Sequence, residues 1–212
     1  MKTEDIIFEE CFLELVYRYP SLLPIRQEFY QLYMHIRTSF ENGGRLYICG
    51  NGGSASDSLH IVGELVKAFT LKRSLEPKFK AIADNDLLEN LEGGLPAFQL
   101  VSNTALTTAF ANDVSSDFIF AQQVYVYAKE NDCILGISTS GNSVNVLNAL
   151  RVAKLKGCKA LSLTGKDGGK MKAFSDVCLI APGSMTHEIQ ELHLPIYHCL
   201  CIMLERYFWP RE

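Results

Sequence analysis

A histidine and a glutamate, His60 and Glu64, stand four positions apart in a stretch whose residue pattern predicts a helix over about 56–69. Residues at this spacing share one helix face, so the imidazole and the carboxylate should lie side by side. Such a pair can remove a proton next to a carbonyl group or hold a divalent metal ion. The alternative is an ordinary surface pair. Apolar neighbours such as Leu59 and Ile61 predict a largely buried helix, where an unpaired glutamate is rare.

Two segments rich in glycine and hydroxyl residues, 50–56 and 138–143, each follow a predicted buried strand and open a predicted helix. Ligands of open α/β sheets bind beyond the carboxyl ends of the strands. Glycine lets the backbone approach an anion, and a helix N-terminus offers free N–H groups. Simple capping and turn formation would explain either segment alone, but the repetition favours a phosphate site. Neither segment is a Walker A motif or a dinucleotide fingerprint.

The last predicted helix, about 186–207, carries Gln190, His193 and His198. Gln190 and His198 are about 12 Å apart along an ideal helix axis. Their side chains could still converge on one ligand, particularly if Pro195 bends the helix. A histidine such as His193 is more often a core or interface residue, and we assign it no ligand.

The elements that must position these residues alternate between helices and short apolar strands. Strands are predicted at 46–49, 98–101, 133–137, 159–163 and 177–180, and helices at about 4–18, 25–41, 56–69, 105–111, 118–129, 144–156 and 186–207. This alternation predicts an α/β fold with a mostly parallel sheet covered on both faces. We found no repeat or linker and expect one domain, 1–212, with an N-terminal helical arm of about 1–43. The long terminal helices exceed what the sheet needs for cover.

Composition narrows the functional classes. The net charge of −4 and the pI near 5.8 do not indicate a basic surface for binding nucleic acid. No segment approaches 18 consecutive apolar residues, so no membrane span is expected, and we see no signal peptide. The seven cysteines are odd in number and contain no C-x-x-C pair, which predicts free thiols and a cytoplasmic location.

The motifs together resemble a known family. Gly50-Asn51-Gly52-Gly53-Ser54 and the segment 137–143 look like the paired phosphosugar signature of the SIS (sugar isomerase) fold. With His60, Glu64, and the segments 163–170 and 189–193, the chain resembles more narrowly the phosphoheptose isomerase family. That resemblance implies a flavodoxin-like three-layer αβα sandwich, a homotetramer with sites at subunit interfaces, and no nucleotide cofactor.

The same resemblance implies an enzyme of heptose biosynthesis, isomerising sedoheptulose 7-phosphate to D-glycero-D-manno-heptose 7-phosphate. The residue matching Glu64 is the base and the one matching His198 is the acid. The implied substrate-binding residues are Asn51, Gly52, Gly53, Ser54, Glu64, Asn112, Asp113, Ser138, Thr139, Ser140, Ser143 and Gln190. In some members zinc is bound by the residues matching His60, Glu64, Gln190 and His198.

The sequence departs from the family pattern in two places, and two alternative functions stay open. Residues 185–188 read Met-Thr-His-Glu where the family usually has an Ala-Asp-Arg-like segment. The region 70–100 is longer than usual and would reshape either the pocket mouth or a subunit contact. One rival is a non-catalytic adaptor of this fold that associates with a replication initiator protein. The other is a regulatory SIS module that senses a phosphosugar. The adaptor lacks the carboxylate and imidazole, so Glu64 and His198 favour catalysis.

Overall fold

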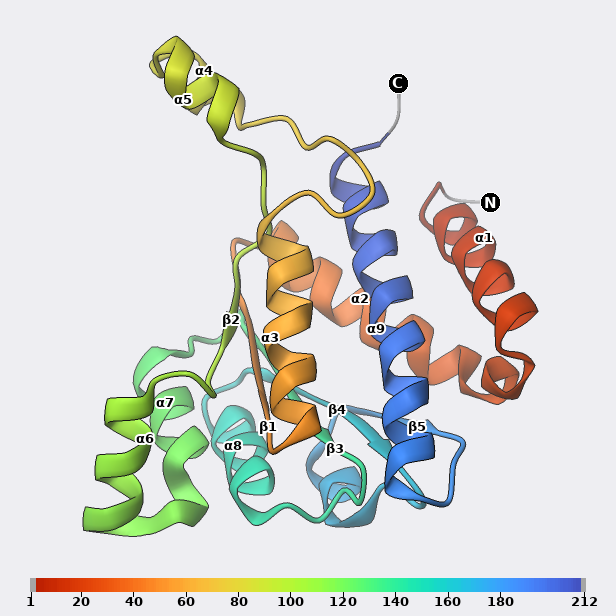
Figure 1. Ribbon diagram of the computed structural model, residues 1–212, viewed down its shortest axis with the longest axis vertical. Helices are drawn as coiled ribbons and strands as arrows, with labels where there is room; N and C mark the ends of the chain where they lie inside the picture. Colours follow the sequence, from red (N-terminus) through yellow and green to blue (C-terminus); the bar gives the residue numbers. More distant parts are fainter. Residues whose placement is uncertain (1–2, 211–212) are drawn as a thin grey trace.

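Five parallel strands form one sheet in the order β2-β1-β3-β4-β5 in the computed structural model (Figure 1). The strands are β1 Leu46–Gly50, β2 Ala97–Gln99, β3 Cys133–Ser138, β4 Lys159–Gly165 and β5 Val177–Ala181. This is the flavodoxin-like strand order, and it confirms the predicted fold class. The structure describes residues 3–210. The first two residues of the expected 1–43 arm and the last two of the expected 1–212 domain lie outside the described residues.

Both faces of the sheet are buried, which explains why the strands read as continuous apolar runs. Along β1, Leu46 and Ile48 pack into one hydrophobic core, while Tyr47 and Cys49 pack into the other. Alternate side chains point to opposite faces of a strand, so each central strand supplies both cores.

Helices form the two outer layers of the sandwich (Figure 1). One core lies between the sheet and α1 Thr3–Arg18, α2 Arg26–Glu41, α3 Gly53–Val66 and α9 Thr186–Phe208. The other lies under α7 Ile119–Tyr127 and α8 Val144–Leu155, with α6 Thr104–Phe110 alongside. The surplus terminal helices are α1 and α9, which pack on each other.

The middle of the unusual region 70–100 forms an arm that projects from the body (Figure 1), whereas Arg73 is buried and Ala97–Gln99 belongs to the sheet. It contains the short helices α4 Pro77–Lys80 and α5 Asn85–Asn90, and it exposes Phe79 and Ile82. The strand predicted at 98–101 is displaced and shortened to β2. The Gln99 side chain accepts hydrogen bonds from the backbone N–H groups of Val101 and Ser102, and this turn ends the strand.

The predicted state of the cysteines is confirmed. All seven are free thiols, and only Cys178 among them is not fully buried. Among residues 3–210 there is no helix with the length and apolar character that crossing a membrane requires.

Candidate active site

The two glycine- and hydroxyl-rich loops lie next to each other at the point where the strand order reverses. β1 and β3 are neighbours, with Gly50 opposite Ile137, so both loops leave the same edge of the sheet. Asn51 Nδ2 donates a hydrogen bond to Asn145 Oδ1 at 2.9 Å, and Asn145 Nδ2 donates one back to Asn51 Oδ1 at 3.0 Å. This amide pair ties the first loop to the start of α8. A switch point of this kind is where doubly wound sheets bind ligands.

The first loop has a backbone that only glycine adopts easily. Gly52 has φ +56° and ψ −123°, in a region closed to residues with a side chain. Gly53 opens α3, and a Cβ placed there would lie 2.5 Å from Nε2 of Gln190. The Gln190 side chain therefore covers the first turn of α3, and the structure brings this predicted ligand-binding residue to the loop. Ser54 is buried beneath the same turn.

The second loop is shaped by the segment 163–170. Ser138 Oγ and Ser143 Oγ are 3.0 Å apart and share a hydrogen bond. Gly141 has φ +63°, and a Cβ there would lie 2.0 Å from the carbonyl oxygen of Gly168. The segment after β4 therefore presses directly on the loop and fixes its path. Thr139 and Ser140 stay partly accessible between these fixed points.

Replacing Gly53 by alanine should weaken substrate handling while leaving the fold intact. The added methyl group displaces only the end of the flexible Gln190 side chain, and alanine favours a helix more than glycine does. Misplacing a positioning group by about 1 Å can lower the rate roughly 100-fold, so we expect kcat/KM to fall by about 10- to 100-fold. Gly63→Ala is the matched control, because no atom lies within 4 Å of its Cβ position. Equal activities of the two variants would contradict the assignment of Gln190.

A cluster of imidazole and carboxylate groups lies further along α3. His60 Nε2 is 3.1 Å from Glu64 Oε1, and His198 Nε2 on α9 is 3.4 Å from His60 Nε2. The Glu64 side chain is 14% exposed, and its Oε2 is buried with no hydrogen-bond partner among the described residues. The structure thus brings three of the predicted residues together, and one of them, Glu64, has an oxygen without a partner.

The environment of α3 is more open than its sequence indicated. Leu59 is 46% exposed and the His60 side chain 41% exposed, so the prediction of a largely buried helix was wrong. One side of α3, with Ile61 and Leu65, packs into the core, while the opposite side faces outward. Burial lowers the pKa of the His198 imidazole, and the neighbouring His60 lowers it further, which favours the neutral ring at pH 7.

Sequence reasoning missed two polar residues that touch this cluster, Asp57 and Tyr197. The Tyr197 hydroxyl donates to Asp57 Oδ1 at 3.2 Å and lies 3.0 Å from His60 Nδ1. Burial, followed by the charge of Asp57, raises the pKa of the Tyr197 phenol, so the hydroxyl keeps its proton. Asp57 precedes His60 by three positions, a helical spacing that could have flagged it. No sequence signal connects either residue to Tyr197, because that contact depends on the packing of α9 against α3.

A buried ion pair ties the end of α3 to α9. Arg73 Nε donates to Glu205 Oε1 at 2.7 Å, and both side chains are fully buried. The same guanidinium donates to the backbone carbonyl oxygens of Leu65 at 2.6 Å and Glu64 at 2.7 Å. It therefore satisfies carbonyl groups that the end of a helix leaves free, and it fixes the backbone of Glu64.

Not every predicted site residue meets the others within one chain. Gln190 lies at Gly53, whereas His198 lies at His60, because α9 continues unbroken through Pro195. Glu64 comes eleven residues after Gly53, a rise of about 16 Å along an ideal helix. The acid–base cluster and the loops are therefore two separate parts of this chain.

Asn112 and Asp113 lie on an exposed π-helical turn, Ala111–Ser115, between α6 and α7. Asn112 Nδ2 donates to Asp113 Oδ1 at 2.8 Å. Single π-helical turns are rare in proteins, and those that occur often lie at functional sites. This one presents both polar side chains to solvent.

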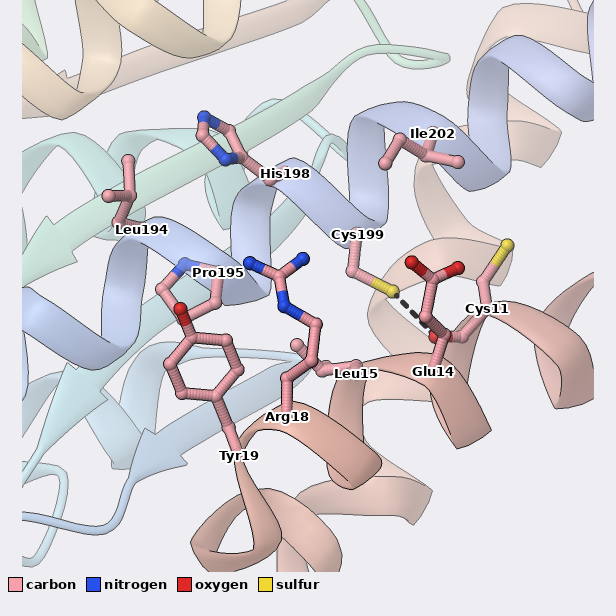
Figure 2. A pocket seen from close by; sticks show the side chains of 10 residues that line it. All are labelled: Cys11, Glu14, Leu15, Arg18, Tyr19, Leu194, Pro195, His198, Cys199 and Ile202. Atoms are coloured by element: carbon pink, nitrogen blue, oxygen red, sulfur yellow. Dashed lines mark hydrogen bonds between the residues drawn. The ribbon is translucent and has the colours of Figure 1, made fainter. Parts of the chain in front are cut away.

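His198 also lines a cavity of about 240 Å³ between α1 and α9 (Figure 2). Figure 2 shows the guanidinium of Arg18 and the carboxylate of Glu14 on the α1 side, facing α9. This cavity reaches His198 from the side of α1, whereas His60 and Glu64 do not line it.

His193 belongs to the core, as expected. Its Nε2 lies 3.0 Å from the carbonyl oxygen of Thr164, and its Nδ1 is buried without a hydrogen-bond partner in the described part of the chain. Burial lowers the pKa of His193 to about 4, against a smaller opposing effect of the Thr164 carbonyl.

This depressed pKa predicts a loss of stability in mild acid. Between the unfolded pKa near 6.5 and the folded pKa, the unfolded chain binds the proton better, so the unfolding free energy falls as pH falls. His193 alone should lower the unfolding free energy by about 2 kcal/mol between pH 7 and pH 5. His193→Gln can still donate to Thr164 and should lose less stability between pH 7 and pH 5 in urea titrations. The difference in unfolding free energy between wild type and His193→Gln should stay constant from pH 7.5 to 8.5. Identical pH profiles over the whole range would contradict this assignment.

Fold and site together define an α/β protein with a candidate phosphate site at its switch point and a separate acid–base cluster on α3 and α9. Comparison with known proteins agrees. The SIS domain family matches residues 26–165. The chain is 45% identical to a phosphoheptose isomerase of Helicobacter pylori over 170 residues, covering 80% of this chain and 79% of the relative.

Solved structures give the same result. A phosphoheptose isomerase from Francisella tularensis superposes with a TM-score of 0.76 at 29% identity, covering 97% of this chain and all of the other. One from Neisseria gonorrhoeae gives 0.74 at 30% identity, covering 92% and 94%. The chain belongs to the phosphoheptose isomerase family of SIS-domain proteins, as its motifs predicted, and it is an isomerase.

Proposed function

We propose that this protein converts sedoheptulose 7-phosphate to D-glycero-D-manno-heptose 7-phosphate by acid–base chemistry. The observation that carries the proposal is the contact among His60, Glu64 and His198 around an unpartnered carboxylate oxygen. The relatives' names supply the phosphoheptose class, and the paired loops supply a phosphate site. A non-catalytic adaptor would have no need of this cluster.

The reaction moves one proton between adjacent carbons. Glu64 removes a proton from carbon 1 of the open-chain ketose, and the electron pair of that C–H bond forms an enediolate. The same carboxyl group returns the proton to carbon 2, which gives the aldose. His198 passes a proton between the two oxygens during this change. Each general acid or base contributes roughly 10²–10⁴ in rate.

Backbone N–H groups and hydroxyls of the two loops bind the phosphate, which suits a protein of net charge −4. Besides Glu64, the proposed substrate-binding residues are Asn51, Gly52, Gly53, Ser54, Asn112, Asp113, Ser138, Thr139, Ser140, Ser143 and Gln190. The side chains of Asn112 and Asp113 hold the sugar hydroxyls.

We further propose that each complete site combines two copies of the chain in a homotetramer. A seven-carbon sugar phosphate extends about 10 Å, from bond lengths near 1.5 Å, whereas the rise from Gly53 to Glu64 is about 16 Å. The loops of one copy and the acid–base cluster of another could therefore share one substrate. The surplus helices α1 and α9 and the projecting arm offer surface for the contacts between copies.

The same cluster suits a zinc ion, with His60, Glu64 and His198 from one copy and Gln190 from another. Imidazole and carboxylate are zinc ligands, and the buried Glu64 Oε2 has no other partner in the described residues. Among residues 3–210, no three His, Cys, Asp or Glu side chains are already arranged as a metal site, so His60, Glu64 and His198 must shift to hold the ion together. When bound, the metal supplies Lewis-acid polarisation of the substrate carbonyl.

We place the protein in the cytoplasm as one domain spanning 1–212. The free state of all seven cysteines supports a reducing compartment.

Turnover is tested by NMR or mass spectrometry with sedoheptulose 7-phosphate. The wild-type protein should form the aldose phosphate, and a metal chelator shows whether a divalent ion contributes. Binding of ketose phosphates without turnover of any of them would favour the sensor function instead.

Sharing of sites between copies is tested by mixing two inactive variants. Glu64→Gln lacks the base, and a Ser138→Ala/Ser140→Ala double variant lacks two hydroxyl groups of the second loop. If each pair of copies exchanges loops and clusters, random mixing should restore about a quarter of wild-type activity. If both parts come from one chain, the mixture stays inactive.

A further inference from the structure

The polar network behind His60 determines where the proton of its ring lies. Tyr197 is 2% exposed, and its hydroxyl contacts both Asp57 Oδ1, at 3.2 Å, and His60 Nδ1, at 3.0 Å. A hydroxyl has one proton to donate. An ionised Asp57 can only accept, so the Tyr197 proton goes to Asp57. Tyr197 must then accept from His60, which requires a proton on Nδ1.

On the other side of the ring, this assignment places two acceptors next to each other. His60 Nε2 faces Glu64 Oε1 at 3.1 Å and His198 Nε2 at 3.4 Å. If a neutral His60 has its proton on Nδ1, its Nε2 is a bare acceptor, and His198 can direct an Nε2 proton at it. If the proton were on Nε2, it would be donated to Glu64 and occupy the lone pair that the base needs.

We propose that Tyr197 and Asp57 form a positioning relay that fixes neutral His60 in its Nδ1-protonated form. The relay leaves His60 Nε2 and both oxygens of Glu64 as a group of acceptors only. Such a group receives a proton from the substrate or a divalent cation. Metal-binding histidines are commonly held in one form by a hydrogen bond from their other ring nitrogen.

The role of the relay in catalysis rests on the proposed function, because the relay acts on the same acid–base cluster. It leaves Glu64 without a hydrogen bond from His60, so the lone pairs of the carboxylate stay open. Tyr197 and Asp57 act through His60 and are positioning residues. Their loss should lower kcat more than it changes KM, because the substrate contacts themselves are retained.

The test is ¹⁵N NMR of the histidine rings in full-length protein without metal or substrate, at pH 8.5. His60 is assigned from the spectrum of His60→Gln. We expect wild-type His60 to have a protonated Nδ1 and a bare Nε2. In Tyr197→Phe the ring stays, including its edge contact with His60 at 5.4 Å between centroids, but the hydroxyl is lost. The proton should then move to Nε2, and zinc affinity measured by chelator competition should fall about 10- to 100-fold.

Tyr207→Phe is the matched control, because this tyrosine lies on the same helix and its hydroxyl donates to Glu41. It should leave both the His60 spectrum and the zinc affinity unchanged. Asp57→Asn keeps the Tyr197 hydroxyl and should shift the His60 proton toward Nε2 to a smaller extent. This variant replaces Tyr197→Phe in the test if Tyr197→Phe does not fold. A wild-type proton on Nε2, or a His60 spectrum unchanged in both variants, would overturn the relay. Because no turnover is measured, failure of the relay and failure of the isomerase function are separate results.

Discussion

Glu64→Gln should abolish measurable isomerisation of sedoheptulose 7-phosphate while the protein stays folded. Glutamine keeps the size and shape of the side chain but cannot accept the proton from carbon 1. Loss of a general base lowers the rate roughly 10²–10⁴-fold. The buried Oε2 of Glu64 has no partner in the described structure, so the substitution breaks no hydrogen bond at that atom.

Two measurements make this test specific to the base. Calorimetry should show that Glu64→Gln still binds the sugar phosphate, because the loops around Gly53 and Ser140 are unchanged. Glu28→Gln, an exposed substitution on α2, should retain wild-type kcat. Full activity of Glu64→Gln would mean that another group removes the proton.

Glu205→Gln should destabilise the fold far more than the same substitution at an exposed ion pair. The carboxylate accepts a hydrogen bond from the Arg73 side chain. It also accepts hydrogen bonds from four groups on three consecutive residues after α3, namely Phe69 N, Thr70 N and Oγ1, and Leu71 N. A neutral amide leaves the buried guanidinium without its counter-charge. Breaking a buried pair in this way costs about 3–5 kcal/mol.

For a chain of this length, that loss corresponds to a fall in Tm of about 6–20 °C by calorimetry. The control is Glu10→Gln, which breaks the pair between Glu10 and Arg206, whose side chains are 56% and 36% exposed. Exposed pairs contribute about 0–1 kcal/mol, so this variant should melt close to the wild type. Similar Tm values for the two variants would contradict the role assigned to the buried pair.

The pKa of Glu205 gives the same pair a pH dependence. Burial acts to raise this pKa, but the hydrogen bonds from Thr70, Phe69 and Arg73 outweigh it and lower the value. Stability from a carboxyl group with a lowered pKa is present above its unfolded pKa and is lost as pH falls through the folded one. The stability difference between wild type and Glu205→Gln should therefore shrink in acid.

The sequence alone determined the fold class and most elements, because their signals are local. The five apolar strands and the glycine loops after β1 and β3 depend on patterns within ten residues of chain. The pairing of His60 with Glu64 follows from helical spacing for the same reason. Motif resemblance then added His198 and Gln190, which no local pattern joins to that pair.

How these parts meet depends on contacts between elements that are far apart in the chain. The packing of α9 on α3 brings His198 and Tyr197 to His60, and Glu205 to Arg73, across more than 130 residues of chain. It also places Gln190 at Gly53, away from the cluster that sequence reasoning assigned it to. Such contacts depend on the angle and register between packed helices. Those are set by the whole core, and no short segment encodes them.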